Sequence, residues 1–200
     1  MSKELEAARA LVKMLEEREQ SNKVKLASLI PGETFFVGER ECIVLEQCEG
    51  ITTVITKGYL AKVRRFAYDA ADYKASELKK YIEGEIQPAI ESEIGAENLV
   101  EHRVNLTTVN GQDDYGVLTC KVRPLTFGEV RAYINLLVNK KLSRQWWTCT
   151  AWSGPHCDYN NSIAVVRPSG YVNSSYCCEG NNVRPAFILK SDIFVSKGEL

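Results

Sequence analysis

Three short strand-like runs follow one another in the first third of the chain. Thr34 to Val37, Cys42 to Glu46 and Ile51 to Thr56 are rich in β-branched and apolar residues. Turn residues separate them, with Gly38 after the first run and Glu49-Gly50 before the last. Short runs at this spacing predict an antiparallel β-meander. Whatever else the chain forms must therefore pack against an antiparallel sheet.

Helices are predicted between and after these strands. Ser76 precedes a helical segment in the way that an N-cap does. Gly84 interrupts that segment, and helical character resumes from Ile86 to Ile94. Thr126 to Glu129 has the pattern of a capping box, which opens a further helix that runs to Val138.

More short strands are predicted in the last third of the chain, at Trp146 to Thr150, Ile163 to Arg167 and Ala186 to Leu189. Strand alternation places Trp147, a predicted structural residue, on one face with Cys149, and Trp146 on the other face with Thr148. A length of 200 residues fits one domain. The predicted fold class is therefore α+β, a single domain with short antiparallel strands and two or three helices.

An amphipathic helix is predicted over residues 3 to 20 as an N-terminal appendage. Its apolar positions follow a heptad spacing: Leu5, Ala8, Val12 and Leu15. A helix this short must dock on something. Packing against its own domain and self-association with a second copy both stay open. The chain is thus divided into a helical appendage at residues 1–27 and a main domain at residues 28–200.

The charge of the chain is balanced. It has 25 basic and 26 acidic side chains, so the formal net charge is −1. This balance does not point to nucleic acid or to an anionic membrane surface as a partner. No apolar run approaches the roughly 18 residues that a membrane helix needs. We expect neither a nucleic-acid partner nor a membrane partner.

The cysteines indicate a reducing compartment. Seven are present, Cys177 and Cys178 are adjacent, and no CxxC pair occurs. The start of the chain lacks the apolar segment of a signal peptide. Reduced thiols and synthesis in the cytoplasm are therefore the expectation.

Polar side chains gather between Asp158 and Pro185. This segment holds five Asn, four Ser and three Tyr, but only four charged residues. Tyr offers rigid contact area, and Asn and Ser offer adaptable hydrogen bonds, as in antibody paratopes. The alternative that these residues only form turns stays open. If residues 158–182 form a contact surface, the candidate ligand-binding residues are Trp152, Asp158, Tyr159, Asn160, Asn161, Tyr171, Asn173, Ser174, Ser175, Tyr176, Asn181 and Asn182.

Neither a metal site nor a catalytic site is expected. His156, Cys157, Cys177 and Cys178 lack the spacing of zinc ligands. His102 and His156 are the only histidines, and neither lies in a recognisable nucleophile signature. His102 is expected at the surface. No cofactor is predicted, and the chain is expected not to be an enzyme.

Arg184 is predicted to be a structural residue. It is a lone Arg in an otherwise apolar closing segment. We therefore expect a buried or half-buried guanidinium that an acidic partner holds through two hydrogen bonds.

Four pieces of the sequence form a recognisable pattern: Gly32 to Phe35 with Ile43 to Glu46, Ser76 to Lys79 with Tyr81, Trp146-Trp147 with Trp152-Ser153, and Val183 to Ala186 with Leu189 to Asp192. Together they resemble a domain family of unknown function that is common in gut bacteria and their phages. The resemblance spans residues 28–196 and is most specific in the C-terminal part. The chain departs from the pattern at Thr148, where Leu is usual, and at Asn182, where Gly is usual.

That family is similar to C-type-lectin-like folds, which include formylglycine-generating enzymes and the variable proteins that phage retroelements diversify. The resemblance implies a C-type-lectin-like scaffold with a ligand surface near its C-terminus. Retroelements change adenines, and Asn, Tyr, Ser, Asp and Cys can all arise from an Asn codon in that way. The composition of residues 158–182 fits such a target.

Sequence and resemblance together predict a non-catalytic binding or display protein. The expected ligand is a glycan or a protein, and the resemblance implies a phage-encoded protein, either a virion component or an accessory protein. Two alternatives stay open. One is an oxidoreductase of the formylglycine-generating type, and the other is a structural phage subunit in which the polar segment forms only turns.

Overall fold

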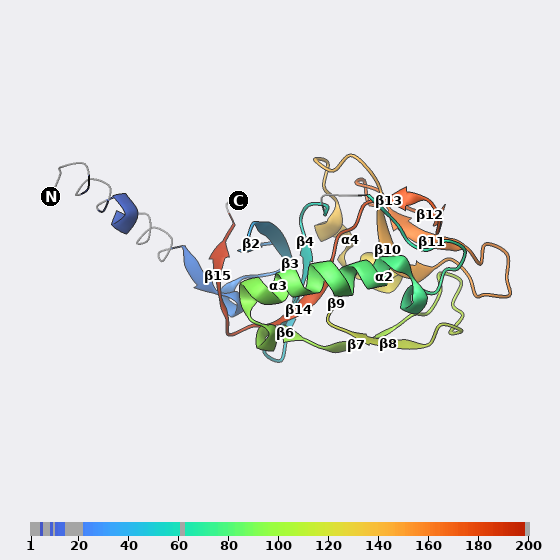
Figure 1. Cartoon of the computed structure of the whole chain (residues 1–200), viewed down its shortest axis with the longest axis horizontal. Helices are drawn as coiled ribbons and strands as arrows, with labels where there is room; N and C mark the ends of the chain where they lie inside the picture. The colour runs from blue at the N-terminus through green and yellow to red at the C-terminus, as the bar shows by residue number, and fades with distance from the viewer. Residues whose placement is uncertain (1–4, 6–8, 10, 15–21, 61–62, 199–200) are drawn as a thin grey trace.

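The computed structural model describes Leu5, Arg9 and residues 11–14, 22–60 and 63–198. Within them the chain forms an α+β body built from antiparallel strands and a few helices (Figure 1). The α+β class predicted from the sequence is confirmed.

The largest sheet has eight strands in the order β1-β15-β2-β3-β4-β14-β6, with β9 also paired to β14. All of its pairings are antiparallel. The predicted meander is confirmed as β2, β3 and β4, in which Phe35 lies opposite Cys42 and Val44 opposite Val54. The strands are β1 (Lys23–Lys25), β2 (Thr34–Val37), β3 (Arg40–Cys48), β4 (Ile51–Thr56), β6 (Leu99–Val100), β9 (Val122–Arg123), β14 (Ala186–Lys190) and β15 (Phe194–Lys197).

A smaller three-stranded sheet lies at the opposite end of the body from β15 (Figure 1). It contains β10 (Trp146–Ala151), β11 (Ser162–Val166) and β12 (Val172–Tyr176). Two short ladders complete the strands: β5 (Arg64–Arg65) with β13 (Gly180–Asn181), and β7 (His102–Asn105) with β8 (Val117–Cys120).

Three consecutive segments form one rod along the body: α2 (Glu77–Tyr81), the π-helical η3 (Ile82–Ile86) and α3 (Gln87–Ile94) (Figure 1). The predicted N-cap is confirmed, because the Ser76 side chain accepts from the Lys79 N–H. Gly84 lies in the π-helical turn and does not end the rod. Pro88 follows in the first turn of α3. Since Pro has no N–H, the wider turn lets the helix continue past it.

The remaining helices are short apart from α4 (Phe127–Leu137). The predicted capping box is present at its start, where the Thr126 hydroxyl and the Glu129 carboxylate satisfy each other's backbone N–H groups. Single 3-10 turns occur at η1 (Leu26–Ser28), η2 (Tyr73–Ala75) and η4 (Ala96–Asn98).

The sheet is covered on both faces. Alternate residues of β3 enter two separate clusters, Val44 with Ile82 and Ile86 of the rod, and Ile43 with Val130 of α4. Strand β10 also divides between the two cores, since Trp147 and Cys149 belong to the first and Trp146 to the second. The predicted alternation is confirmed, and both faces of β10 are buried. The polar segment that follows β10 in the chain is therefore attached to a strand that is packed on both faces.

The N-terminal region differs from the predicted division at residue 27. Strand β1 pairs with β15, so Lys23–Lys25 already belongs to the main sheet. The described residues before it, Leu5, Arg9 and 11–14, are helical as predicted. Leu5 and Val12 of the predicted seam are exposed, whereas Ala8 and Leu15 lie outside the described residues.

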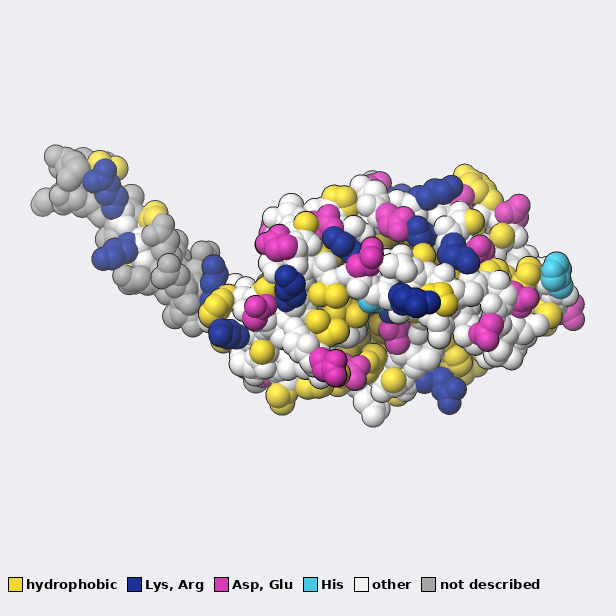
Figure 2. Space-filling model, turned by 90° about the horizontal axis from the view of Figure 1, so that it is seen from below, with side chains coloured by type: hydrophobic (Ala, Val, Ile, Leu, Met, Phe, Trp, Pro, Cys, Tyr) yellow, Lys and Arg dark blue, Asp and Glu magenta, His cyan; other side chains and the backbone are white. Residues whose placement is uncertain are grey.

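Charged side chains of both signs are interspersed over the face that Figure 2 presents. Across the described ranges, no helix has both the length and the apolar character required to cross a bilayer.

Candidate ligand-binding surface

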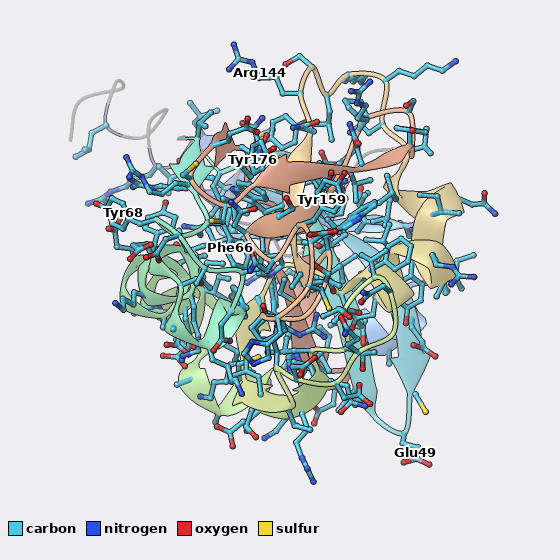
Figure 3. All side chains as sticks on the ribbon, turned by 90° about the vertical axis from the view of Figure 1, so that its right-hand side faces the viewer. Glu49, Phe66, Tyr68, Arg144, Tyr159 and Tyr176 are labelled. Carbon is cyan, nitrogen blue, oxygen red and sulfur yellow. The ribbon has the colours of Figure 1, made fainter. Side chains whose placement is uncertain are left out.

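Three large aromatic side chains of the polar segment are exposed. Tyr159 is 63% exposed, Tyr171 62% and Tyr176 52%. Tyr159 lies between β10 and β11, Tyr171 in the turn between β11 and β12, and Tyr176 at the end of β12. Figure 3 looks onto this end of the molecule and labels Tyr159 and Tyr176. Asp158 and Asn160 are exposed beside Tyr159. The strand register places Tyr159 and Tyr176 at the Ser162 end of the β11–β12 hairpin and Tyr171 at its other end. We call these five residues, which extend over the length of the hairpin, the display surface.

The strands beneath the display surface are firmly held. All five residues of β11 are buried, and β11 pairs along its whole length with β12. Thr148, at the position where the family pattern has Leu, is buried and donates to the Ala164 carbonyl at 2.7 Å. The Tyr171 turn closes through the Arg167 N–H, which donates to the Tyr171 carbonyl at 2.8 Å. These contacts leave little conformational freedom below the exposed tyrosines.

A second loop supports the segment that carries Tyr159. The Gly154 N–H donates to the Gln112 side-chain oxygen at 2.7 Å, and the Val109 N–H donates to the Ala151 carbonyl at 3.0 Å. Within the segment, the Asn160 amide donates to the Pro155 carbonyl at 3.0 Å. Sequence reasoning missed Gln112, since no local pattern connects it with a loop more than forty residues away.

Tyr159 has a left-handed backbone conformation with φ of +62°. A bulky side chain is rare in this region, where it costs about 1–2 kcal/mol relative to the right-handed region. The only other described non-glycine residue with positive φ is Glu49, in the β3–β4 turn. Strain of this kind persists where the surrounding structure imposes it, and it often marks a functional site.

Three of the predicted ligand-binding residues are buried instead of exposed. Ser175 and Asn181 are 6% exposed and Asn182 is 7% exposed. The Asn181 amide donates to the Ser175 hydroxyl at 2.8 Å and accepts from Gln145 Nε2 at 2.9 Å, while the Ser175 hydroxyl donates to Glu179 at 2.5 Å. Asn182 Nδ2 likewise donates to the Gln145 carbonyl at 3.3 Å. Because these side chains already have hydrogen-bond partners within the protein, we remove the three residues from the contact surface. Here the turn interpretation describes the segment better.

The other predicted contact residues are partly buried. They are Trp152, Asn161, Asn173 and Ser174. The Asn173 side chain accepts from the Ser174 N–H at 2.9 Å, and the Asn161 carbonyl accepts from the Cys177 N–H at 2.8 Å. These residues lie between the exposed tyrosines and the core, where they shape the backbone and keep only part of their surface available.

Arg184 is wholly buried, as predicted. The prediction that an acidic side chain holds its guanidinium is wrong. Its Nε donates to the Thr56 carbonyl at 3.0 Å and its Nη1 to the Leu137 carbonyl at 3.3 Å. The guanidinium lies 5.1 Å from the centre of the Trp146 ring, and Nη2 has no hydrogen-bond partner among the residues that the structure describes. Burial lowers the pKa of Arg184 to about 10. Arg184 is thus a structural residue that joins β4, α4 and β10 through carbonyls and a ring.

We expect Arg184→Lys to lower the free energy of unfolding by about 1–3 kcal/mol, because a lysine cannot donate to both carbonyls and stack on Trp146. Arg167→Lys, at an exposed arginine beside Tyr171, is the control and should change stability by less than about 0.5 kcal/mol. Urea unfolding of the two variants measures this. Equal effects in both would contradict the structural role.

A largely buried ion pair lies elsewhere in the described part of the chain. Arg123 donates to both oxygens of Glu129, at 2.7 and 2.6 Å, and its Nε donates to His102 Nε2 at 3.2 Å. His102, which we expected at the surface, is therefore half-buried. Burial, followed by the Arg123 charge, lowers the pKa of His102. Sequence position gave no signal for this cluster, which joins β7, β9 and α4.

The adjacent cysteines point to opposite sides of the chain. Cys177 is buried and Cys178 is exposed. Burial raises the pKa of Cys177, as it does for Cys42 and Cys149, whose pKa values rise to about 12. In the portion of the chain that the structure describes, no group of three or more His, Cys, Asp or Glu side chains is arranged to hold a metal ion.

Comparison with known proteins adds no family to this picture, because neither a family model nor a curated protein nor a solved structure matches the chain. The surface is therefore interpreted from its own chemistry.

Proposed function

We propose that this chain is a non-catalytic binding protein of C-type-lectin-like architecture whose display surface contacts a protein partner. The observation that carries the proposal is the exposure of Tyr159, Tyr171 and Tyr176 on strands and turns that are otherwise fixed. Rigid tyrosines contribute contact area at a small entropic cost, which is how paratopes bind. Tyrosine is also among the residues that dominate binding energy in protein interfaces.

A protein partner suits this surface better than a glycan does. The three tyrosines stand outward, and only Asp158 carries a charge among the five display residues. The cores of protein interfaces are enriched in Tyr and depleted of charge. The phage origin and the retroelement diversification are supported only by the sequence resemblance and the composition of residues 158–182. Codons in this segment that cannot derive from AAC or AAT by adenine changes would remove the diversification.

Tyr159→Asn should raise the free energy of unfolding by about 0.5–1 kcal/mol, because Asn tolerates the left-handed region that Tyr159 occupies. Urea unfolding measures the change. Tyr171→Asn serves as control, since Tyr171 is equally exposed but has no positive φ. If Tyr159→Asn instead lowers the free energy of unfolding, the Tyr159 ring stabilises the fold by more than its left-handed backbone conformation costs.

The binding proposal is tested with the triple variant Tyr159→Ala, Tyr171→Ala and Tyr176→Ala. Wild type and variant are applied to arrays of purified bacterial surface proteins and of glycans. We expect wild type to bind at least one protein probe and the variant to bind it at least about a hundredfold more weakly, since interface tyrosines often contribute about 1–2 kcal/mol each. Phe194→Ala is the matched control, because Phe194 is 63% exposed on β15, outside the polar segment.

Three outcomes would overturn the proposal. The triple variant could bind as tightly as wild type, the Phe194→Ala control could lose as much binding, or wild type could bind only glycan probes. The last outcome would keep the surface and replace the partner.

A further inference from the structure

A polar groove of about 550 Å³ lies between α2 and the β5–β13 ladder. Its volume is in the range of sites that enclose small ligands. Two arginines, Arg64 and Arg65, and two glutamates, Glu77 and Glu85, line it, so its formal charges cancel. Tyr68, an exposed residue that also lines the groove, is labelled in Figure 3.

Arg64 is fixed in place from three directions. Its carbonyl accepts from Trp147 Nε1 at 2.7 Å, and its backbone pairs with Asn181 in the ladder. Its guanidinium stacks on Tyr81, 4.1 Å from the ring centre. A planar guanidinium held against a ring keeps its edge in a set direction, which suits recognition of a carboxylate.

The two arginines of the groove contact aromatic rings, but none of its four charged side chains pairs with an opposite charge among the described residues. Within the described residues, Arg64, Arg65, Glu77 and Glu85 make no side-chain hydrogen bond or ion pair. Arg64 Nε and Glu77 Oε2 are buried and unsatisfied. Water does not reach these two atoms, so a ligand in the open groove would meet the other guanidinium nitrogens of Arg64 and the other carboxylate oxygen of Glu77, which are accessible and have no hydrogen-bond partner among the described residues.

These observations favour one class of ligand. It must offer an acceptor to Arg64 and hydrogen-bond donors to Glu77. The lining offers both polar and apolar surface, as a sugar ring with hydroxyls and C–H faces does, and the size of the groove exceeds that of a single carboxylate and ammonium. A sugar ring with a carboxylate meets all of these requirements. We propose that the groove is a second binding site, separate from the display surface, that takes a uronic-acid residue with its carboxylate on Arg64 and its hydroxyls on Glu77.

Cys178 makes the site measurable, because this exposed thiol lines the groove. Iodoacetamide labelling of the full chain is followed peptide by peptide, with and without D-glucuronate. Cys48, exposed on β3 away from the groove, is the internal control. At a ligand concentration about ten times its Kd, labelling of Cys178 should slow about tenfold, because only the free fraction reacts. Labelling of Cys48 should not change.

Variants distinguish binding in the groove from a general effect of D-glucuronate on labelling. Arg64→Lys keeps the charge but loses the planar fork, and Glu77→Gln keeps the shape but loses the charge. Both should abolish the protection of Cys178, while Glu39→Gln at an exposed glutamate should leave it intact. Glu77→Gln keeps the test valid if Arg64→Lys fails to fold. Glucose has the hydroxyls without the carboxylate, and acetate has the carboxylate without the ring, so each should protect Cys178 only weakly.

The proposal fails if D-glucuronate gives no protection at saturating millimolar concentrations, or if protection survives in both variants. Glycine that protects as well as D-glucuronate would replace the sugar with a zwitterion and would also overturn the proposal. None of these results depends on Tyr159, Tyr171 or Tyr176, so the test is independent of the proposed partner surface.

Discussion

Replacing Glu129 with Ala should lower the free energy of unfolding by about 3–5 kcal/mol, because it leaves the Arg123 charge buried without a partner. The Arg123 side chain is 5% exposed and that of Glu129 26% exposed, so solvent screens the pair weakly. Glu129 also accepts from the Thr126 N–H at 2.7 Å, and its loss removes half of the capping box of α4. Urea unfolding at neutral pH measures the effect.

Two further variants test whether the loss of stability comes from the unpaired Arg123 charge. Glu83→Ala breaks the partly exposed Lys79–Glu83 pair on the rod and should cost less than about 1 kcal/mol. The double variant Arg123→Met with Glu129→Met removes both charges and should recover much of the stability. A loss in Glu129→Ala no larger than in Glu83→Ala would show that the Arg123 charge is compensated in another way.

The same pair should give the protein an acid-sensitive component. Burial acts to raise the pKa of Glu129. The hydrogen bonds from Arg123, the positive charge of Arg123 and the hydrogen bonds from Thr126 together outweigh burial, so the pKa is lowered. A glutamate with a lowered folded pKa stabilises the fold fully above its unfolded pKa of about 4.3. That contribution is lost as the pH falls through the folded value. The stability difference between wild type and Glu129→Ala should therefore shrink below about pH 4.

Local chemistry explains what the sequence could predict. The Ser76 cap and the Thr126–Glu129 box depend on residues three positions apart, and both occur as predicted. The meander and the alternation of Trp146 and Trp147 follow from the period of a strand. The α+β class rests on these elements alone.

Long-range contacts explain what the sequence could not predict. Arg184 was expected to pair with an acid, yet its partners are the carbonyls of Thr56 and Leu137, which depend on how β14 lies against β4 and α4. Composition placed Asn181 and Tyr159 in the same polar segment, but Asn181 is buried, where it pairs with β5, and Tyr159 is exposed. A count of residue types cannot separate a side chain that fills a hydrogen-bond network from one that faces solvent.

Trp147 connects the core with the proposed groove. Its replacement should lower the free energy of unfolding about as much as the loss of Glu129 does. It is wholly buried, packs edge-on against Phe66 at 5.6 Å between ring centres, and donates to the Arg64 carbonyl. Trp147→Ala should lower the free energy of unfolding by about 3–5 kcal/mol through the cavity it leaves. Tyr171→Ala, at an exposed aromatic residue, should change it by less than about 0.5 kcal/mol.

Trp147→Phe separates packing from hydrogen bonding. It keeps most of the buried ring but leaves the Arg64 carbonyl without its donor, so the stability loss should fall to about 1–3 kcal/mol. Since that hydrogen bond anchors the strand that carries Arg64, Trp147→Phe should also reduce protection of Cys178 by D-glucuronate. A variant that is destabilised but fully protected would mean that the ladder with β13 and the stack on Tyr81 suffice to position Arg64.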